Sequence, residues 1–308
     1  TVPPLPDRPR PPRQDSGPLA AQEDGEEVAV QLSLSTRVAE APGNKERAVL
    51  DLEAVAALAH ECGYAAVCMR ASQVGIDSPP EAVRAARAIL DRYGLRVSMV
   101  TGDFPIPANH ERAPEVLRHI RPYLDLAEAL GSDLIRVGMK QAEDIAWAQR
   151  ACDEARERGI RLAHQCHTAS LFETVAGAVT TLRAVDRANF GVIYEPANLE
   201  ACGEDYGPEA IRALAPWIMN VYLQNQILRP EGRSVMNTWV RGPVRFDWIP
   251  LDDPRGIDFD AIFAGLRAIG YDGTVTVHQP LTEGETPAEV ARRSAAFLRR
   301  YVDGEEIR

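Results

Sequence analysis

The chain has 308 residues, of which 45% are hydrophobic and 26% are charged, and its formal net charge at pH 7 is −11. This is the composition of a globular protein whose core is large enough to be stable without disulfides or a structural metal. The net negative charge of the chain is a poor match for a nucleic acid. The five cysteines show no CxxC spacing and no apolar run is long enough to span a membrane. We therefore expect a cytoplasmic protein that acts on small molecules, with no nucleic-acid partner and no membrane partner.

Residues 1–27 are rich in proline and charge and include the runs PPLP and RPRPPRQ. Such a segment buries little apolar surface, so it predicts a disordered tail. An arm that reaches a partner subunit is the alternative, and a homo-oligomer is compatible with the sequence. Residues 28–308 are then expected to form one folded domain.

From Val28 onward, short apolar runs alternate with longer helical patterns, several of which end in glycine. The expected strands are Val28–Leu34, Ala65–Ala71, Arg96–Thr101, Leu134–Met139, Arg161–His167, Phe190–Glu195, Met219–Gln226 and Gly273–His278. The expected helices are Lys45–Cys62, Pro80–Tyr93, Arg112–Leu130, Glu143–Arg158, Leu171–Val185, Pro208–Trp217, Asp258–Ile269 and Thr286–Tyr301. Strands that alternate with helices pair in parallel, and about eight such units predict a closed (β/α)8 TIM barrel. A doubly wound open sheet, the alternative, would usually show a glycine-rich turn after its first strand, and the segment LSLSTRVAEAPG lacks that pattern.

One connection is unusually long. Ile227–Gly256 follows the seventh strand and contains Trp239, Arg241 and Trp248. Long ordered loops of compact domains are usually lids or binding loops, so we expect this segment to cover the mouth of the barrel and to bring Trp239 or Trp248 toward a ligand. A surface excursion or an oligomer contact is the alternative.

Polar side chains gather where the expected strands end, which is where barrels of this type place their active sites. They are Arg70 and Gln73 after strand two, Asp103 after strand three, Arg136 on strand four, Gln165 and His167 on strand five, Glu195 and Asn198 on strand six, Tyr222 and Gln224 on strand seven, and His278 on strand eight. Buried groups of this kind are costly unless they are paired or used. Their occurrence on consecutive strands predicts a functional site, whereas Cys166 has outward parity and is no candidate nucleophile.

The segments HQCH, YEPANL and GYDGTVTVHQP lie on the last strands in an order that resembles the xylose isomerase-like TIM-barrel superfamily. That superfamily includes ketose 3-epimerases, hydroxypyruvate isomerase, inosose dehydratase and endonuclease IV. The resemblance extends from Val28 to about Val302, and it implies a TIM barrel. It also implies one divalent metal held at the ends of strands five to eight, and no organic cofactor.

By position, the metal ligands that the resemblance implies are Gln165, Glu195, Gln224 and His278, with Tyr222 competing with Gln224. Gln165 and His278 stand where the family has carboxylates, so the family's two-base epimerisation does not transfer unchanged. An imidazole ligand shifts the expected preference from Mg²⁺ toward Mn²⁺, with Co²⁺ and Zn²⁺ as alternatives. The expected acid–base groups are Glu195, His278 and His167.

The leading hypothesis is an isomerase or epimerase of a sugar or polyol-carbonyl compound that works by proton abstraction next to a carbonyl and stabilisation of an enediolate. A lyase or dehydratase acting on a keto-sugar or keto-glycoside through the same enolate is the first alternative. A catalytically degenerate sugar-binding barrel is the second, and the acidity of the chain opposes DNA repair. The side chains expected to contact a small carbohydrate are Arg70, Gln73, Asp103, Arg136, Asn198, Trp239, Arg241 and Trp248.

Overall fold

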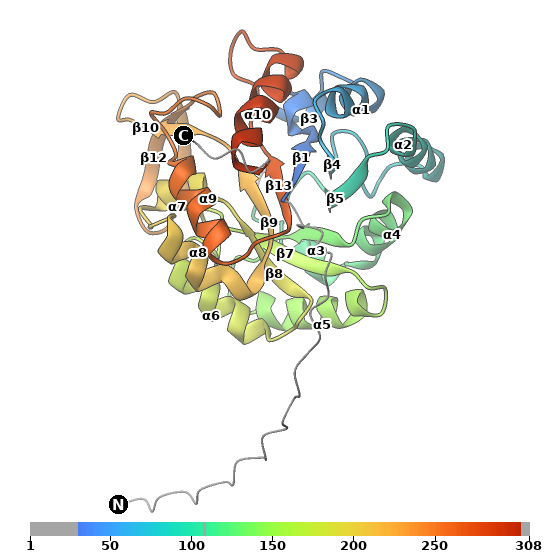
Figure 1. The fold of residues 1–308 in the computed structure, drawn as a ribbon. Coiled ribbons are helices and arrows are strands. Elements are labelled where there is room, and N and C mark those ends of the chain that lie inside the picture. The colour runs from blue at the N-terminus through green and yellow to red at the C-terminus, as the bar shows by residue number, and fades with distance from the viewer. Residues whose placement is uncertain (1–29, 107–108, 303–308) are drawn as a thin grey trace, which may run out of the picture.

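A computed structural model describes residues 30–106 and 109–302, and the predicted tail, 1–27, lies outside them. Eight parallel strands close into a barrel in the order β1-β13-β9-β8-β7-β6-β5-β4 (Figure 1), which confirms the predicted (β/α)8 fold. These strands are β1 Gln31–Ser35, β4 Ala66–Arg70, β5 Arg96–Thr101, β6 Leu134–Val137, β7 Arg161–Gln165, β8 Phe190–Tyr194, β9 Ile218–Leu223 and β13 Thr274–Val277. Each coincides with a predicted strand within a few residues, because continuous apolar runs mark strands that are buried on both faces.

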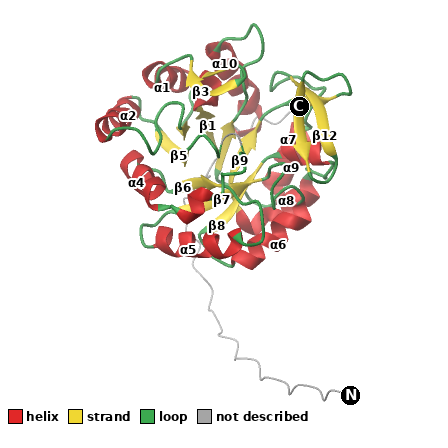
Figure 2. Cartoon of the chain, turned by 180° about the vertical axis from the view of Figure 1, so that it is seen from behind, coloured by secondary structure: helices red, strands yellow, loops and turns green. Residues whose placement is uncertain are grey.

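Helices cover the outside of the barrel, and Figure 2 shows them around the strands from the opposite side. They are α1 Leu52–Glu61, α2 Pro80–Arg92, α3 Glu115–Arg118, α4 Arg121–Leu130, α5 Asp144–Arg156, α6 Val175–Val185, α7 Pro196–Cys202, α8 Pro208–Leu214, α9 Phe259–Ala268 and α10 Pro287–Val302. Gly131 ends α4 with a left-handed φ of 68°, and its N–H donates to the carbonyls of Ala127 and Glu128. Glycine ends helices in this way because it has no Cβ to oppose a positive φ.

The predicted helix Lys45–Cys62 begins too early. Its first residues form β3 Asn44–Ala48, which pairs antiparallel with β2 Glu40–Ala41 in a hairpin above the barrel. The helix begins only after Asp51, whose side chain accepts a hydrogen bond of 2.9 Å from the N–H of Ala54. This N-cap satisfies a backbone donor that the helix itself leaves unpaired.

The structure differs from the predicted helices at two further places. The predicted helix Arg112–Leu130 is two helices, α3 and α4, because His119 takes a non-helical φ of −134° between them. The short helix α7 directly after β8 was not predicted. It begins at Pro196, in the first turn where a missing N–H costs nothing.

The long connection after β9 is not an irregular loop. It forms an antiparallel sheet from β10 Gln226–Leu228, β12 Gly242–Trp248 and β11 Ser234–Thr238. Figure 1 shows β10 and β12 together at one side of the barrel. All five cysteines are buried and free. None of the helices within 30–106 and 109–302 is long and apolar enough to cross a membrane.

Candidate active site

A cavity of about 740 Å³ opens at the C-terminal ends of the barrel strands, and we call it the inner cavity. Asn198 reaches it from α7, and the residues that reach it from strands or strand ends are Arg136, Gln165, His167, Gln224 and His278. Those that reach it from connections include Arg37, Lys45, Glu111, Lys140, Trp239 and Trp248. Because parallel strands end at one rim of a barrel, residues far apart in the sequence meet there.

A series of hydrogen-bonded side chains joins the turn after β1 to the C-terminal ends of β8 and β9. The Arg37 guanidinium donates through Nη1 to Gln224 Oε1 at 2.8 Å and to the His278 carbonyl at 3.2 Å. The Gln224 amide donates in turn to Glu195 Oε1, and Asn198 Nδ2 donates to Glu195 Oε2 at 2.9 Å. These hydrogen bonds fix the orientation of the Gln224 and Asn198 side-chain amides, because the NH₂ group of each amide donates to Glu195.

Glu195 lies at the buried end of this series of hydrogen bonds. Its side chain is fully buried and does not line the inner cavity, although Gln224 and Asn198 above it do. Burial raises the pKa of Glu195 to about 8, against the opposing influence of the Arg37, Arg136 and Lys45 cations. A buried carboxyl of this kind holds a proton at pH values where a solvent-exposed glutamate is ionised.

Three histidines, His110, His167 and His278, line the inner cavity, and the last two are uncharged near neutral pH. His167 is partly exposed, and its Nδ1 lies 3.1 Å from the Thr168 carbonyl. Because a carbonyl only accepts, Nδ1 carries the proton and Nε2 keeps its lone pair. Burial and the nearby Arg136 charge hold the pKa of His167 well below its ordinary value.

His278 is more enclosed. Its Nδ1 lies 3.2 Å from Ser35 Oγ, and its ring stacks on Tyr222 with centroids 4.1 Å apart. Burial, and after it the charge of Arg37, holds the pKa of His278 well below its ordinary value. Tyr222 itself is buried under His278 and contacts Cys68 Sγ through its hydroxyl at 3.0 Å. Gln224, rather than Tyr222, is therefore the side chain of β9 and its end that lines the cavity.

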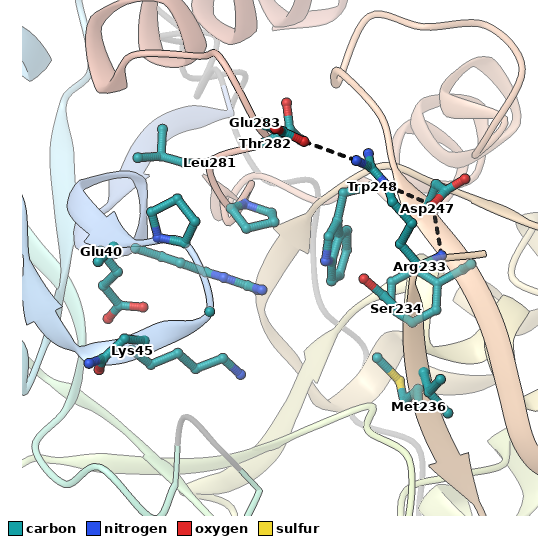
Figure 3. Close-up of a pocket in the computed structure, with 18 of the residues that line it drawn as sticks. Glu40, Lys45, Arg233, Ser234, Met236, Asp247, Trp248, Leu281, Thr282 and Glu283 are labelled. Carbon is teal, nitrogen blue, oxygen red and sulfur yellow. Dashed lines mark hydrogen bonds and ion pairs between the residues drawn. The ribbon is translucent and has the colours of Figure 1, made fainter.

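A second cavity of about 820 Å³ adjoins the inner one and shares Arg37, Lys45 and Trp248 with it. We call it the outer cavity. Figure 3 shows it between the β2–β3 hairpin, which carries Glu40 and Lys45, and the β11–β12 sheet, which carries Met236 and Trp248. The segment 227–256 therefore lies over the barrel mouth and brings both predicted tryptophans to the cavity.

Residues 56–301 match the family described as xylose isomerase-like TIM barrel. The chain belongs to that family. Its strand order and closed barrel agree with the family's fold. No curated protein sequence matches this xylose isomerase-like barrel significantly.

Solved structures share the fold of this xylose isomerase-like barrel at low sequence identity. The probable 3-DHS dehydratase AsbF from Bacillus anthracis is 16% identical with a TM-score of 0.63, over 87% of this chain and 98% of that one. A D-allulose 3-epimerase from Methylomonas sp. is 17% identical with a TM-score of 0.62, over 89% and 98%. A xylose isomerase-like TIM barrel protein from Mycobacterium smegmatis in complex with magnesium is 16% identical with a TM-score of 0.64, over 89% and 96%.

The side chains of this xylose isomerase-like barrel do not fit a divalent cation at the predicted ligand positions. In the described part of the chain, no group of three or more His, Cys, Asp and Glu side chains is placed to hold a metal. Both oxygens of Glu195 already accept amide hydrogen bonds, and the oxygen of Gln224 accepts from Arg37. A guanidinium thus lies on the amide oxygen that a metal would need, and only Glu195 among the expected ligands can be an anion.

The structure brings half of the predicted carbohydrate contacts of this xylose isomerase-like barrel to the inner cavity, namely Arg136, Asn198, Trp239 and Trp248. The other four line neither cavity. Arg70 pairs with Glu40, Gln73 donates to the Leu50 carbonyl, Asp103 accepts from the Tyr123 hydroxyl, and Arg241 donates to the Ala201 carbonyl. Their polar groups serve the protein's own contacts, which strand position alone does not reveal.

Two cations of the site in this xylose isomerase-like barrel were not predicted. Arg37 lies in a short 3₁₀ turn, Thr36–Ala39, directly after β1, and its N–H donates to Ser35 Oγ. Its position just past a strand end was a usable signal. Lys45 lies on β3, which overlaps the start of the predicted helix Lys45–Cys62.

Proposed function

We propose that this protein catalyses proton transfer at a carbon next to a carbonyl group in a small polyol-carbonyl compound, as an isomerase or epimerase. The observation that carries the proposal is His167. It lines the inner cavity as a neutral imidazole whose Nδ1–H is held by the Thr168 carbonyl. A neutral histidine with a fixed tautomer presents a free lone pair at Nε2 that can take a proton, and its lowered pKa makes it a weaker base than an ordinary histidine.

In the proposed step His167 Nε2 takes the proton as the C–H bond breaks, and the bonding electron pair moves to the carbonyl oxygen to give an enolate or enediolate. The Arg37 guanidinium, which lines the same cavity, stabilises the developing negative charge. The His167 imidazolium then returns the proton to the neighbouring carbon as the hydroxyl proton passes between the two enediolate oxygens, which gives the isomer. Epimerisation by His167 alone requires the enediolate to turn over in the cavity before it takes the proton back, because His167 reaches one face of the carbon. Gln224 and Glu195 act as positioning residues because their hydrogen bonds orient Arg37.

The D-allulose 3-epimerase and the dehydratase among the structural neighbours support chemistry of this class. The dehydratase also favours a lyase as a second candidate. The same enolate would then expel a group from the neighbouring carbon rather than take back a proton. Solvent exchange at the acidic carbon is common to both reactions, and loss of water or another group distinguishes the lyase.

A metal-dependent form of the reaction is favoured by the neighbour crystallised with magnesium. The residues that the sequence assigns to this ion, Mn²⁺ in preference to Mg²⁺ because of the imidazole, are Gln165, Glu195, Gln224 and His278. The hydrogen bonds of Glu195 and Gln224 would have to break before these side chains could hold it. Elemental analysis after incubation with Mn²⁺, Co²⁺ and Zn²⁺ tests this form. One equivalent of bound ion that is lost in Glu195→Gln and kept in Cys166→Ala would establish it in place of the Arg37 mechanism.

The proposed function is tested by incubating the purified chain in D₂O with a panel of ketoses and keto-sugar acids and following deuterium incorporation by NMR. We expect exchange with at least one member, and a loss of about 10³-fold in rate in His167→Asn, because general bases contribute roughly that factor. His119→Asn, at an exposed position, is the matched control and should exchange as the wild type does. Undiminished exchange in His167→Asn would refute the role of His167, and binding without any exchange would indicate a degenerate barrel.

A further inference from the structure

We propose that the inner cavity binds a polyhydroxylated carboxylate, such as a sugar acid or a keto-sugar acid, with its carboxylate group on Arg136. This names the substrate class of the proposed function and rests on that function only in placing the reacting molecule in the same cavity. Three groups of the cavity wall carry the inference, and each lacks a hydrogen-bond partner among the residues that the structure describes.

The first group is the guanidinium of Arg136. It belongs to β6, lines the inner cavity and is only 3% exposed. Its Nε is buried without a hydrogen-bond partner, and no hydrogen bond or ion pair links its side chain to any residue of 30–106 or 109–302. A buried cation without an anion is costly, and a guanidinium offers five N–H donors in a planar fork. Arg136 is therefore a strong anion-binding group to which the described part of the chain supplies no counter-ion.

The charges around Arg136 strengthen this reading. Arg37 and Lys140 line the same cavity, and burial lowers the pKa of Arg37 and of Arg136 only to about 10, so both guanidinium groups stay charged at neutral pH. Burial lowers the pKa of Lys45, which also lines the cavity, to about 7. Glu195 acts on Arg136 through space, but no ion pair joins them. Glu111 is the acidic residue that lines the inner cavity. An incoming anion thus meets more positive than negative charge.

The second and third groups are acceptors. Gln165 Oε1 and Asn198 Oδ1 have no hydrogen-bond partner within 30–106 and 109–302, and both residues line the inner cavity, although solvent does not reach these two oxygens in this structure. The orientation of Asn198 is fixed, because its Nδ2 donates to Glu195 and to the Cys166 carbonyl. Unpaired carbonyl oxygens in a cavity call for donors, and hydroxyl groups of a ligand supply them. An anion together with hydroxyl groups describes a polyhydroxylated acid.

A phosphate group shares the anionic chemistry, and the structure favours the carboxylate. One guanidinium fork matches the two oxygens of a planar carboxylate. Phosphate sites commonly add backbone N–H groups from a glycine-rich turn at a helix N-terminus, and the turn after β1 is STRVAEAPG. The experiment below separates the two anions.

The test is calorimetric titration of the full chain with matched pairs: D-gluconate against D-glucitol, and D-galactonate against D-galactitol, with D-glucose 6-phosphate as the phosphate arm. We expect at least one carboxylate to bind about ten-fold more tightly than its neutral partner, which is the scale of a charge-assisted pair. Arg136→Gln should abolish this preference and leave binding of the alditols unaltered. Arg96→Gln, at an exposed position at the start of β5, is the matched control and should keep the preference.

The thermal midpoint of the ligand-free variant gives a second readout. Arg136→Gln should raise it by about 5 °C because the substitution removes a buried charge without a partner. A fall in the midpoint would show that Arg136 supports the fold and would contradict the proposal.

Three binding outcomes would also overturn the proposal: equal affinity for acids and alditols, no binding of either acid at about 50 mM, or a preference that survives in Arg136→Gln. Tighter binding of the sugar phosphate would replace the carboxylate by a phosphate. Selective acid binding without proton exchange would contradict the proposed function alone.

Discussion

Strands β4 and β6 each carry one buried arginine, and the two arginines have opposite surroundings. We call the surroundings of Arg70 the β4 mouth and those of Arg136 the β6 mouth. On β4, Arg70 is 1% exposed and donates to both oxygens of Glu40, at 2.6 and 3.1 Å. On β6, Arg136 is 3% exposed, has no partner in the described part of the chain and lines the inner cavity. The two residues look alike in the sequence, since each is an arginine in an apolar strand. The comparison teaches that a buried charge indicates a binding site only when the fold has left it unpaired.

Arg37 is the intermediate case. It has neutral partners, the Gln224 oxygen and the His278 carbonyl, and its guanidinium lies over the Trp248 ring at 5.4 Å from the centroid. Burial lowers the pKa of Arg37 to about 10. Arg37 is therefore oriented by the protein but not neutralised by it, which is what stabilisation of a transient anion requires.

The largest effect is expected from turning the β4 mouth into a copy of the β6 mouth. Glu40→Gln leaves Arg70 buried without an anion, and breaking a buried ion pair in this way costs about 4 kcal/mol. We expect the free energy of unfolding, measured with urea, to fall by about that amount. Glu46→Gln, at an exposed position of the same hairpin, should alter it by less than about 0.5 kcal/mol. Equal stability of the two variants would break the comparison between Arg70 and Arg136.

How far the sequence predicted the fold follows from its patterning. The eight barrel strands were placed within a few residues because each is an apolar run between helical segments. The β2–β3 hairpin and the sheet after β9 were missed because their residues are largely exposed and lack an apolar run. Such elements depend on contacts with the barrel, which local pattern does not show.

The site was predicted in part for the same kind of reason. Alternation along β7 placed Gln165 and His167 on one side, and both line the inner cavity. Alternation cannot tell which strand-end side chains are already paired. Arg70 was therefore ranked with Arg136, although its partner Glu40 lies 30 residues away in a hairpin that was not predicted. Pairing across the mouth is a property of the tertiary structure and becomes visible only there.

An intermediate effect concerns the protonation of Glu195, which decides whether Arg136 has a negative neighbour at neutral pH. Its pKa is about 8 in the folded chain and about 4.5 when unfolded. Above pH 4.5 the unfolded state loses its proton first, so stability should fall as the pH rises and level off above about pH 8. Between pH 5 and 9 the wild type should lose on the order of 3 kcal/mol relative to Glu195→Gln, which has no proton to lose.

Parallel urea unfolding of the wild type and Glu195→Gln across this pH range measures the difference. A constant difference would mean that Glu195 is ionised throughout. Glu195 would then neutralise part of the charge of Arg136, and the contrast between the two mouths would be weaker than proposed.

The smallest expected effect is on ligand affinity. It distinguishes the two tryptophans of the segment 227–256 and tests whether Arg37 contacts the ligand. Trp248 lines both cavities and covers the Arg37 guanidinium, whereas Trp239 is 58% exposed. A cation–π contact of this kind is worth about 1 kcal/mol, so Trp248→Leu should weaken binding of a sugar acid roughly five-fold, and Trp239→Leu should weaken it less.

Fluorescence gives an independent readout, because a ligand that enters beside Arg37 alters the surroundings of the Trp248 indole. The emission change on saturation should persist in Trp239→Leu and disappear in Trp248→Leu. The reverse result would place the ligand against the exposed ring, away from Arg37, and would remove Arg37 from the proposed stabilisation of the enolate.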